Sequence, residues 1–244
     1  CCVLYAVPST FTGGGGTFIE SNATQIDANS RRYTFSSSGH GLVANDLFCV
    51  WDDNPGSYSN ERFYYYQGEY LTVNNVSGAT VSFDESFYNT YLSGTSKLYK
   101  VSTIEVLLKD FDVISTADCY IIFNMHYCRQ SIIDNVNITL ESAYAGVYLH
   151  NAYDCSITNC VNKIADSLDS GHRMYPVIIG NSQRIRVDNY SGKSRWHAIA
   201  VGGANDGLNV VNREIIITNC VLSSQNGNTH HQTVFSHLIT DQLI

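Results

Sequence analysis

The chain has 244 residues, of which 44% are apolar and 15% are charged, and its formal net charge is −8. This negative balance argues against a nucleic-acid partner, which requires a basic surface. No apolar run reaches the length of about 18 residues that a membrane-spanning helix needs, so we expect no membrane insertion.

Residues 1–41 form the first predicted segment. An apolar start and a run of glycines lead into Thr17-Phe18-Ile19, which we interpret as an N-terminal segment or first coil with its turn. Gly39-His40-Gly41 predicts a turn before a strand. The start at Cys1 and the end at Ile244, inside a strand-like run, look like cuts in a longer polypeptide, and we expect a C-terminal part to be missing.

Residues 42–104 have a different pattern. Short alternating runs such as Tyr70-Leu-Thr-Val73 and Thr80-Val-Ser-Phe83 are separated by turn signals, for example at Ser77-Gly78. Such spacing is typical of antiparallel strands. We therefore predict an irregular antiparallel β insertion, whose tyrosines favour packing over the alternative of stacking on sugar rings.

Residues 105–244 contain a repeat. An apolar residue, a polar one, Asn or Asp, and then a core-type residue recur five times, with the third position at Asp110, Asn135, Asn159, Asn189 and Asn219. Subtracting successive numbers gives spacings of 25, 24, 30 and 30. Periods of this size indicate stacked coils in which each repeat buries its face against its neighbours.

These repeats have strand chemistry and no sustained helical period. Strands that return every ~25 residues without crossover helices pair in parallel only if the chain winds as a solenoid. The predicted fold is all-β: a right-handed parallel β-helix with an N-terminal β-rich insertion. Each Asn should occupy a left-handed bend and stack on the amide of the next coil. The residue after it should point inward, giving the column Phe111, Val136, Cys160, Tyr190 and Cys220.

Cysteine spacing points to structural thiols. The eight cysteines contain no C-x2-C pair and no histidine at zinc-finger spacing. We therefore predict buried or free thiols in a protein that folds in a reducing cytosol.

Two insertions mark the candidate site, because function collects in loops on rigid scaffolds. Asn159 is 18 residues before Val177, whereas Asn135 is 12 residues before Val147. The second insertion precedes Ile217. The candidate catalytic residues from the two loops and the strand between them are Asp166, Asp169, His172, Arg195, His197, Asp206 and Arg213. The candidate substrate-binding residues are Tyr148, His150 and Arg173.

These residue types leave two reactions open. Paired carboxylates suit glycoside hydrolysis, in which one protonates the leaving oxygen and the other activates water or attacks. Arginine near a uronate instead favours β-elimination, because it stabilises the enolate. We expect no cofactor. Asp166 and Asp169 offer Ca²⁺ only two carboxylates, which would make a weak site.

Four stretches carry a resemblance to a known family. They are Gly41-Leu-Val-Ala-Asn-Asp-Leu-Phe; Lys97-Leu-Tyr-Lys-Val leading into Val106-Leu-Leu-Lys-Asp-Phe; Gly146-Val-Tyr-Leu-His-Asn with Cys155-Ser-Ile-Thr-Asn-Cys; and Ser194-Arg-Trp-His-Ala-Ile-Ala-Val-Gly-Gly followed by Asn212-Arg-Glu-Ile-Ile-Ile-Thr-Asn-Cys. In these features the chain resembles the pectate-lyase-like β-helix proteins of phage tails, the tail appendages and tailspikes of short-tailed phages. One departure is Phe235-Ser236-His237, where related chains have an Asp and a His.

The resemblance implies a homotrimer on a virion tail, assembled in the host cytoplasm and joined to tail or head–tail connector proteins. Such a protein would bind host surface polysaccharide or teichoic acid during adsorption, and degradation of that glycan stays open. The alternative is a polysaccharide lyase or glycoside hydrolase of the same fold that is not attached to a virion.

Overall fold

The computed structural model describes residues 4–6, 8, 16–20, 23–25, 31–55, 66–91, 94, 96–115, 119–141, 143–164, 174–203, 208, 210–224 and 234–236. Within them the protein is all-β, as predicted, with strands β1 to β21 and no helix. Accordingly, this part of the chain offers no helix long and apolar enough to cross a membrane. The chain divides into two compact units. The parallel unit comprises residues 1–8, 104–204 and 212–244, and the antiparallel unit comprises residues 9–103 and 205–211.

The antiparallel unit contains one seven-stranded sheet in the order β2-β8-β5-β6-β7-β4-β3. Its strands are β2 (Thr17–Glu20), β3 (Thr24–Gln25), β4 (Arg32–Thr34), β5 (Leu47–Pro55), β6 (Tyr66–Ser77), β7 (Thr80–Phe83) and β8 (Ser96–Val101). All described pairs are antiparallel. Of residues 1–41, which we interpreted as an N-terminal segment or first coil, β1 (Leu4–Ala6) pairs with a strand of the parallel unit. β2 pairs with β8, β4 pairs with β7, and β3 pairs with β4 in the antiparallel sheet.

An aromatic core explains why β4 joins this sheet. Tyr33 on β4 is fully buried, and its ring contacts Phe48 and Phe87. Burying a side chain of this size contributes about 2 kcal/mol. Tyr70 and Tyr91 are also buried, in line with the predicted packing role of the tyrosines.

Gly39-His40-Gly41 is a turn in the antiparallel unit, as the sequence indicated. Gly41 adopts a positive φ of 74°, which glycine tolerates without strain. The His40 Nδ1 accepts the Leu42 amide hydrogen at 3.1 Å, and its Nε2 lies 3.2 Å from the Gly78 carbonyl oxygen. His40 therefore holds a loop together.

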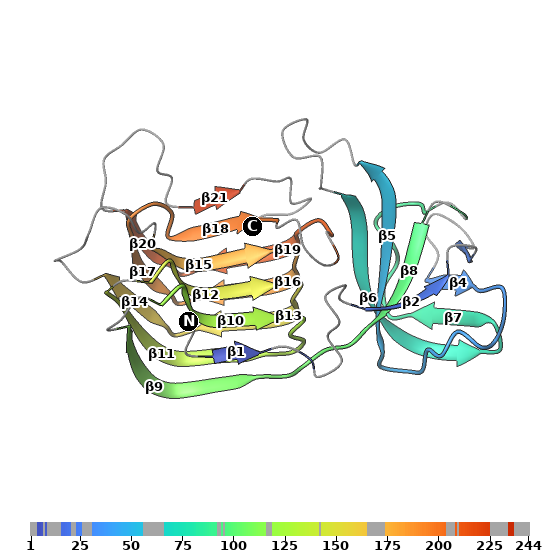
Figure 1. The fold of residues 1–244 in the computed structure, drawn as a ribbon, viewed down its shortest axis with the longest axis horizontal. Helices are drawn as coiled ribbons and strands as arrows, with labels where there is room; N and C mark the ends of the chain where they lie inside the picture. Colours follow the sequence, from blue (N-terminus) through green and yellow to red (C-terminus); the bar gives the residue numbers. More distant parts are fainter. Residues whose placement is uncertain are drawn as a thin grey trace. The chain divides into compact units, whose positions relative to one another are not determined.

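The parallel unit contains two sheets whose strands follow one another in register (Figure 1). The six-stranded sheet has the order β1 (Leu4–Ala6), β10 (Ile121–His126), β12 (Ala145–His150), β15 (Tyr175–Gly180), β18 (Ile199–Gly202) and β21 (Val234–Ser236). All its described pairs are parallel. The antiparallel unit is inserted in the chain between β1 and β9, the first strand of the second sheet.

The second sheet has eight strands and a bend. They are β9 (Leu107–Ser115), β11 (Ile132–Leu140), β13 (Tyr153–Thr158), β14 (Val161–Ile164), β16 (Gln183–Asp188), β17 (Ser191–Ser194), β19 (Arg213–Thr218) and β20 (Val221–Ser224). β11 pairs with β13 through its first half and with β14 through its second half. Each repeat therefore contributes two strand segments here and one strand to the six-stranded sheet.

The predicted ladder lies at the bend. Asp110, Asn135, Asn159, Asn189 and Asn219 all have φ between 49° and 60°. Asparagine and aspartate tolerate this left-handed region because their side chains bond locally. Asn135 donates to Asp110 at 2.8 Å, and Asn189 donates to Asn159 at 2.8 Å. The left-handed bend is confirmed at all five positions, but the stack of amides is only partly so, because Asn159 donates to Asp134 and Asn219 donates to Asp188.

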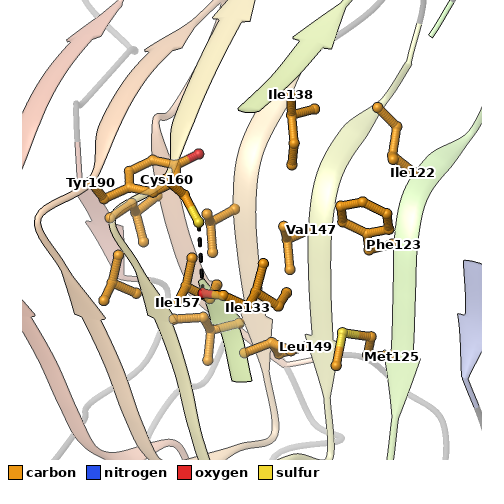
Figure 2. Close-up of a cluster of buried hydrophobic side chains, with 14 of the residues drawn as sticks. Ile122, Phe123, Met125, Ile133, Ile138, Val147, Leu149, Ile157, Cys160 and Tyr190 are labelled. Carbon is orange, nitrogen blue, oxygen red and sulfur yellow. Dashed lines mark hydrogen bonds between the residues drawn. The ribbon is translucent and has the colours of Figure 1, made fainter. Parts of the chain in front are cut away.

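Three of the five residues that follow the ladder positions are buried, as predicted, and Cys220 is partly buried. Val136, Cys160 and Tyr190 are buried, whereas Phe111 in the first repeat is 37% exposed. Figure 2 shows Cys160 and Tyr190 among Ile133, Ile157 and Val147 in the core.

The six described cysteines are free thiols, and all but Cys220 are buried; Cys1 and Cys2 lie outside the described residues. Burial raises the pKa of the Cys155 thiol to about 12, so this thiol stays protonated at neutral pH. It therefore behaves as a small apolar side chain.

Candidate functional site

The outer face of the six-stranded sheet is the first part of the candidate site. Tyr148 aligns with Ile178 and Ala200 on neighbouring strands, and His150 aligns with Gly180 and Gly202. These six residues share one face. A side chain on Gly180 would place its Cβ 3.2 Å from the Tyr148 ring. Gly180 thus makes room for Tyr148.

Four aromatic side chains continue this face along the N-terminal edge of the sheet, where its strands begin. We name Tyr120, Tyr144, Tyr175 and Trp196 the aromatic strip. Tyr120 and Tyr144 stack with centroids 4.8 Å apart and ring planes 8° apart. Tyr144 meets Tyr175 at 5.3 Å, and Tyr175 meets Trp196 at 6.3 Å, both edge-on.

Backbone hydrogen bonds between neighbouring strands align the residues of the aromatic strip. The amide of Tyr144 donates to the Tyr120 carbonyl at 2.9 Å, and the amide of Tyr175 donates to the Tyr144 carbonyl at 2.8 Å. Tyr120 is 62% exposed, so the strip reaches solvent. Sequence reasoning missed this strip, although an aromatic residue at or just before the start of a strand in successive repeats was a visible signal.

Arg195 and His197 lie beside the strip. Both belong to the connection between β17 and β18, on either side of Trp196. His197 is buried, with its ring 5.6 Å from that of Tyr175. Arg195 is partly exposed. The structure therefore brings two predicted catalytic residues to the aromatic strip.

Five predicted site residues lie outside the described residues: Asp166, Asp169, His172, Arg173 and Asp206. The first four fall in the connection between β14 and β15, which ends one residue before Tyr175 at the same edge as the strip. Asp206 falls in the connection between β18 and β19, within the segment 205–211 of the antiparallel unit. In that unit, Val210 lies against Gly68.

Arg213 lies at the other end of the sheet. It begins β19, which follows the C-terminal end of β18, whereas Arg195 precedes the start of β18. The four residues of β18 span roughly 13 Å. Arg213 is also 1% exposed. The structure therefore does not gather the predicted catalytic residues around one point.

Tyr148 and His150 occupy different depths of the outer face. Their rings stack 5.3 Å apart with planes 10° from parallel. Tyr148 is partly exposed, but His150 is 1% exposed. A ligand on this face would therefore contact Tyr148. It would not contact His150, whose buried ring packs against the ring of Tyr148.

Within the described residues, no group of three or more His, Cys, Asp or Glu side chains is arranged to hold a metal ion. The Ca²⁺ alternative at Asp166 and Asp169 concerns residues outside that part of the chain. What the described site offers is aromatic surface with arginine and histidine at its edge. Flat ring faces suit the C–H surfaces of sugars, and the guanidinium group of Arg195 suits anionic groups.

A family model matches part of this chain. Residues 12–101 match the family described as tailspike protein-like, Ig-like domain. This range covers the described strands of the seven-stranded sheet. No curated protein sequence matches the chain.

Three solved structures are similar over most of the chain. The tailspike protein gp49 from Pseudomonas phage LKA1 matches with a TM-score of 0.71 and 28% identity, over 93% of this chain and 39% of its own. The gp54 tailspike of Acinetobacter baumannii bacteriophage AP22, solved with A. baumannii capsular saccharide, matches with a TM-score of 0.69 and 22% identity, over 90% and 36%. The Pseudomonas phage phi297 tailspike gp61 matches with 0.67 and 22%, over 87% and 35%.

The fold and these matches define a class first: all-β proteins that combine stacked parallel strands with an Ig-like antiparallel domain. Within that class, the chain is similar to phage tailspike proteins, through the family match of residues 12–101 and through 28% identity to gp49 over 93% of its length. The chain spans about two fifths of the length of the tailspikes that it matches.

Proposed function

We propose that this chain binds host cell-surface polysaccharide as part of a tailspike on the phage tail. The observation that carries the proposal is the aromatic strip, since stacked and edge-on rings follow one another across four repeats. Tyr120 is exposed, Tyr144 and Trp196 are partly exposed, and Tyr175 is buried between its neighbours. The accessible ring surface suits the apolar faces of sugar rings. The AP22 tailspike was solved with capsular saccharide, which supports the same class of ligand here.

The proposed scaffold is a right-handed parallel β-helix. The three strand segments of each repeat and the αL positions at the bend support it. A β-helix places equivalent residues of successive repeats about 4.8 Å apart along its axis. The aromatic strip then forms a platform that runs across the strands.

The direct test is binding of the purified chain to a panel of capsular and lipopolysaccharide-derived glycans and teichoic acids, measured by calorimetry. We expect saturable binding to glycans of the host strain and none to unrelated ones. Absence of binding to every host glycan would contradict the proposal.

Degradation of the bound glycan is a second proposal. Asp166 and Asp169 lie in the connection that ends at the strip, and Arg195 and His197 lie beside it. In a hydrolase, the two aspartates would act as acid and base or nucleophile. In a lyase, Arg195 would stabilise the enolate and His197 would abstract the proton. His172, from the same connection, would serve as a further acid or base, and Arg173 would bind the glycan.

A digest separates these readings. New reducing ends without ultraviolet absorbance from unsaturated sugars indicate hydrolysis, whereas new reducing ends together with that absorbance indicate elimination. Loss of either product in Asp169→Ala, with binding retained, would support the catalytic assignment. Binding without any product would leave a binding protein only.

We further propose that the protein is a homotrimer attached to the virion through tail or head–tail connector proteins. Exposed apolar side chains on the second sheet, such as Leu107 and Ile132, favour a covering partner. Light scattering should give three times the chain mass. The alternative, a glycan-degrading enzyme not attached to a virion, predicts that mass spectrometry of purified particles finds no peptide of this chain.

A further inference from the structure

Two histidines face each other on neighbouring strands of the six-stranded sheet. His126 on β10 pairs in register with His150 on β12. Their Nδ1 atoms lie 3.2 Å apart, and their rings are 4.8 Å apart with planes at 71°. Neither the glycan-binding proposal nor the degradation proposal uses this pair of nitrogen atoms.

The other ring nitrogens are held by amides. The His126 Nε2 lies 2.9 Å from Asn124 Oδ1, an atom that only accepts. The His126 Nε2 therefore carries the hydrogen, and its Nδ1 is the basic nitrogen. This is the usual arrangement of a metal-binding histidine, whose second nitrogen donates to a carbonyl or carboxylate oxygen.

His150 has a similar support. Its Nε2 lies 3.3 Å from the side-chain amide of Asn181. With the amide nitrogen of Asn181 facing the ring, His150 carries its hydrogen on Nδ1 and donates it to His126. The oxygen and nitrogen of an amide exchange places by a half turn. With the oxygen facing the ring, the hydrogen moves to Nε2 and both Nδ1 atoms become acceptors for a cation.

We propose that the Nδ1 atoms of His126 and His150 bind one divalent transition-metal ion of the zinc type. Zinc–nitrogen bonds measure about 2.0–2.1 Å, so two ligands of a tetrahedral ion lie about 3.3 Å apart. The observed separation of 3.2 Å matches this span. The backbone already brings the ligands together, so binding needs only a tautomer change and rotation of one amide.

The side chains around the two histidines favour a transition-metal ion over Ca²⁺ or Mg²⁺. The six strands of this sheet contain no Asp, Glu, Lys or Arg. Imidazole nitrogen suits Zn²⁺, Cu²⁺ and Ni²⁺, whereas Ca²⁺ and Mg²⁺ require oxygen ligands. Among the described residues no third His, Cys, Asp or Glu completes a larger cluster. Water therefore fills the remaining positions, and it can enter because His126 is partly exposed.

The test is a calorimetric titration of the chelator-treated full chain with Zn²⁺. We expect one site that His126→Ala weakens at least about tenfold. His126→Phe keeps the ring volume and should lose the site equally, which covers the case in which the alanine variant folds poorly. His40→Ala is the matched control, because His40 belongs to the antiparallel unit, and it should bind as the unchanged chain does.

Nitrogen-15 NMR of labelled histidines identifies the atoms. Zn²⁺ should shift the Nδ1 resonances of His126 and His150 and leave that of His40 in place. It should raise the melting temperature of the unchanged chain and of His40→Ala, but not that of the two His126 variants. An unchanged titration in both His126 variants would overturn the proposal, as would shifts confined to other histidines or no binding by the unchanged chain.

Discussion

Asn189 donates its side-chain amide to the Oδ1 of Asn159, 2.8 Å away and one repeat earlier in the chain. Both residues hold a left-handed backbone at the same bend. The hydrogen bond therefore forms between two residues that have the same backbone conformation in successive repeats, and it holds these stacked repeats in register. The aromatic strip depends on that stacking, because its rings meet only when successive strands are in register.

Replacing Asn189 should therefore destabilise the parallel unit. Asn189→Ala replaces a residue that tolerates the left-handed region by one that does not, and it removes the hydrogen bond, for a combined cost of about 2 kcal/mol. Asn189→Gly keeps the backbone conformation and should cost about 1 kcal/mol or less. Urea unfolding compares the two variants. Equal stability of the two would show that backbone conformation contributes nothing here.

The close packing of Gly146 against the neighbouring strands gives a second prediction. A Cβ added to Gly146 would lie 2.5 Å from Asn162 Nδ2 and 2.8 Å from the Pro176 carbonyl oxygen. Gly146→Ala should thus cost about 1–3 kcal/mol by overpacking. At Gly39, the nearest atom to an added Cβ is 3.6 Å away. Gly39→Ala is the control and should stay within about 0.5 kcal/mol of the unchanged chain.

Asp188 should make stability depend on acid pH. Hydrogen bonds from Thr218, Arg186 and Asn219 lower the pKa of its carboxyl to about 2. The unfolded-state pKa is about 3.9. Because the folded pKa is the lower one, the stabilisation is complete above about pH 4 and is lost as pH falls toward 2.

The unfolding midpoint in urea should accordingly fall more steeply from pH 5 to pH 2.5 in the unchanged chain than in Asp188→Asn. The asparagine keeps an acceptor for Thr218 but does not titrate. Parallel pH profiles for the two proteins would contradict the assigned role of this carboxylate.

In the antiparallel unit, Glu69 holds a loop. Its buried carboxylate accepts the amide hydrogens of Tyr88 and Asn89 at 2.8 Å each, and the Tyr91 hydroxyl at 2.8 Å. Glu69→Gln places a donor against these donors and should cost about 1–3 kcal/mol. Hydrogen exchange of the Tyr88 and Asn89 amides should quicken. The exposed Asp84→Asn is the control, and equal exchange in both variants would rule out this role.

The sequence predicted those features that short local patterns encode. The repeated pattern of an apolar residue, a polar residue and Asn was enough to place the bend, its left-handed conformation and the buried residues Val136, Cys160 and Tyr190. It was also enough to indicate parallel strands, because no helical period was available for crossovers.

The sequence did not predict features that depend on the strand register between repeats of different length. Tyr144 follows Tyr120 by 24 residues, but Tyr175 follows Tyr144 by 31, so the strip has no constant period. The burial of His150 under Tyr148 could not be foreseen either, because it depends on which neighbouring position is glycine. The segment containing Asp206 looked like a site loop from its length alone, yet it belongs to the antiparallel unit.

Binding of host surface polysaccharide to Trp196→Ala and Tyr144→Ala tests the central claim most directly. Truncating one ring of the strip should weaken binding about tenfold, from lost stacking of about 1.5 kcal/mol. Tyr88→Ala, an exposed tyrosine of the antiparallel unit, should bind as the unchanged chain does. Unchanged affinity in both strip variants, with their folds intact by circular dichroism, would contradict the assignment of the glycan to this face.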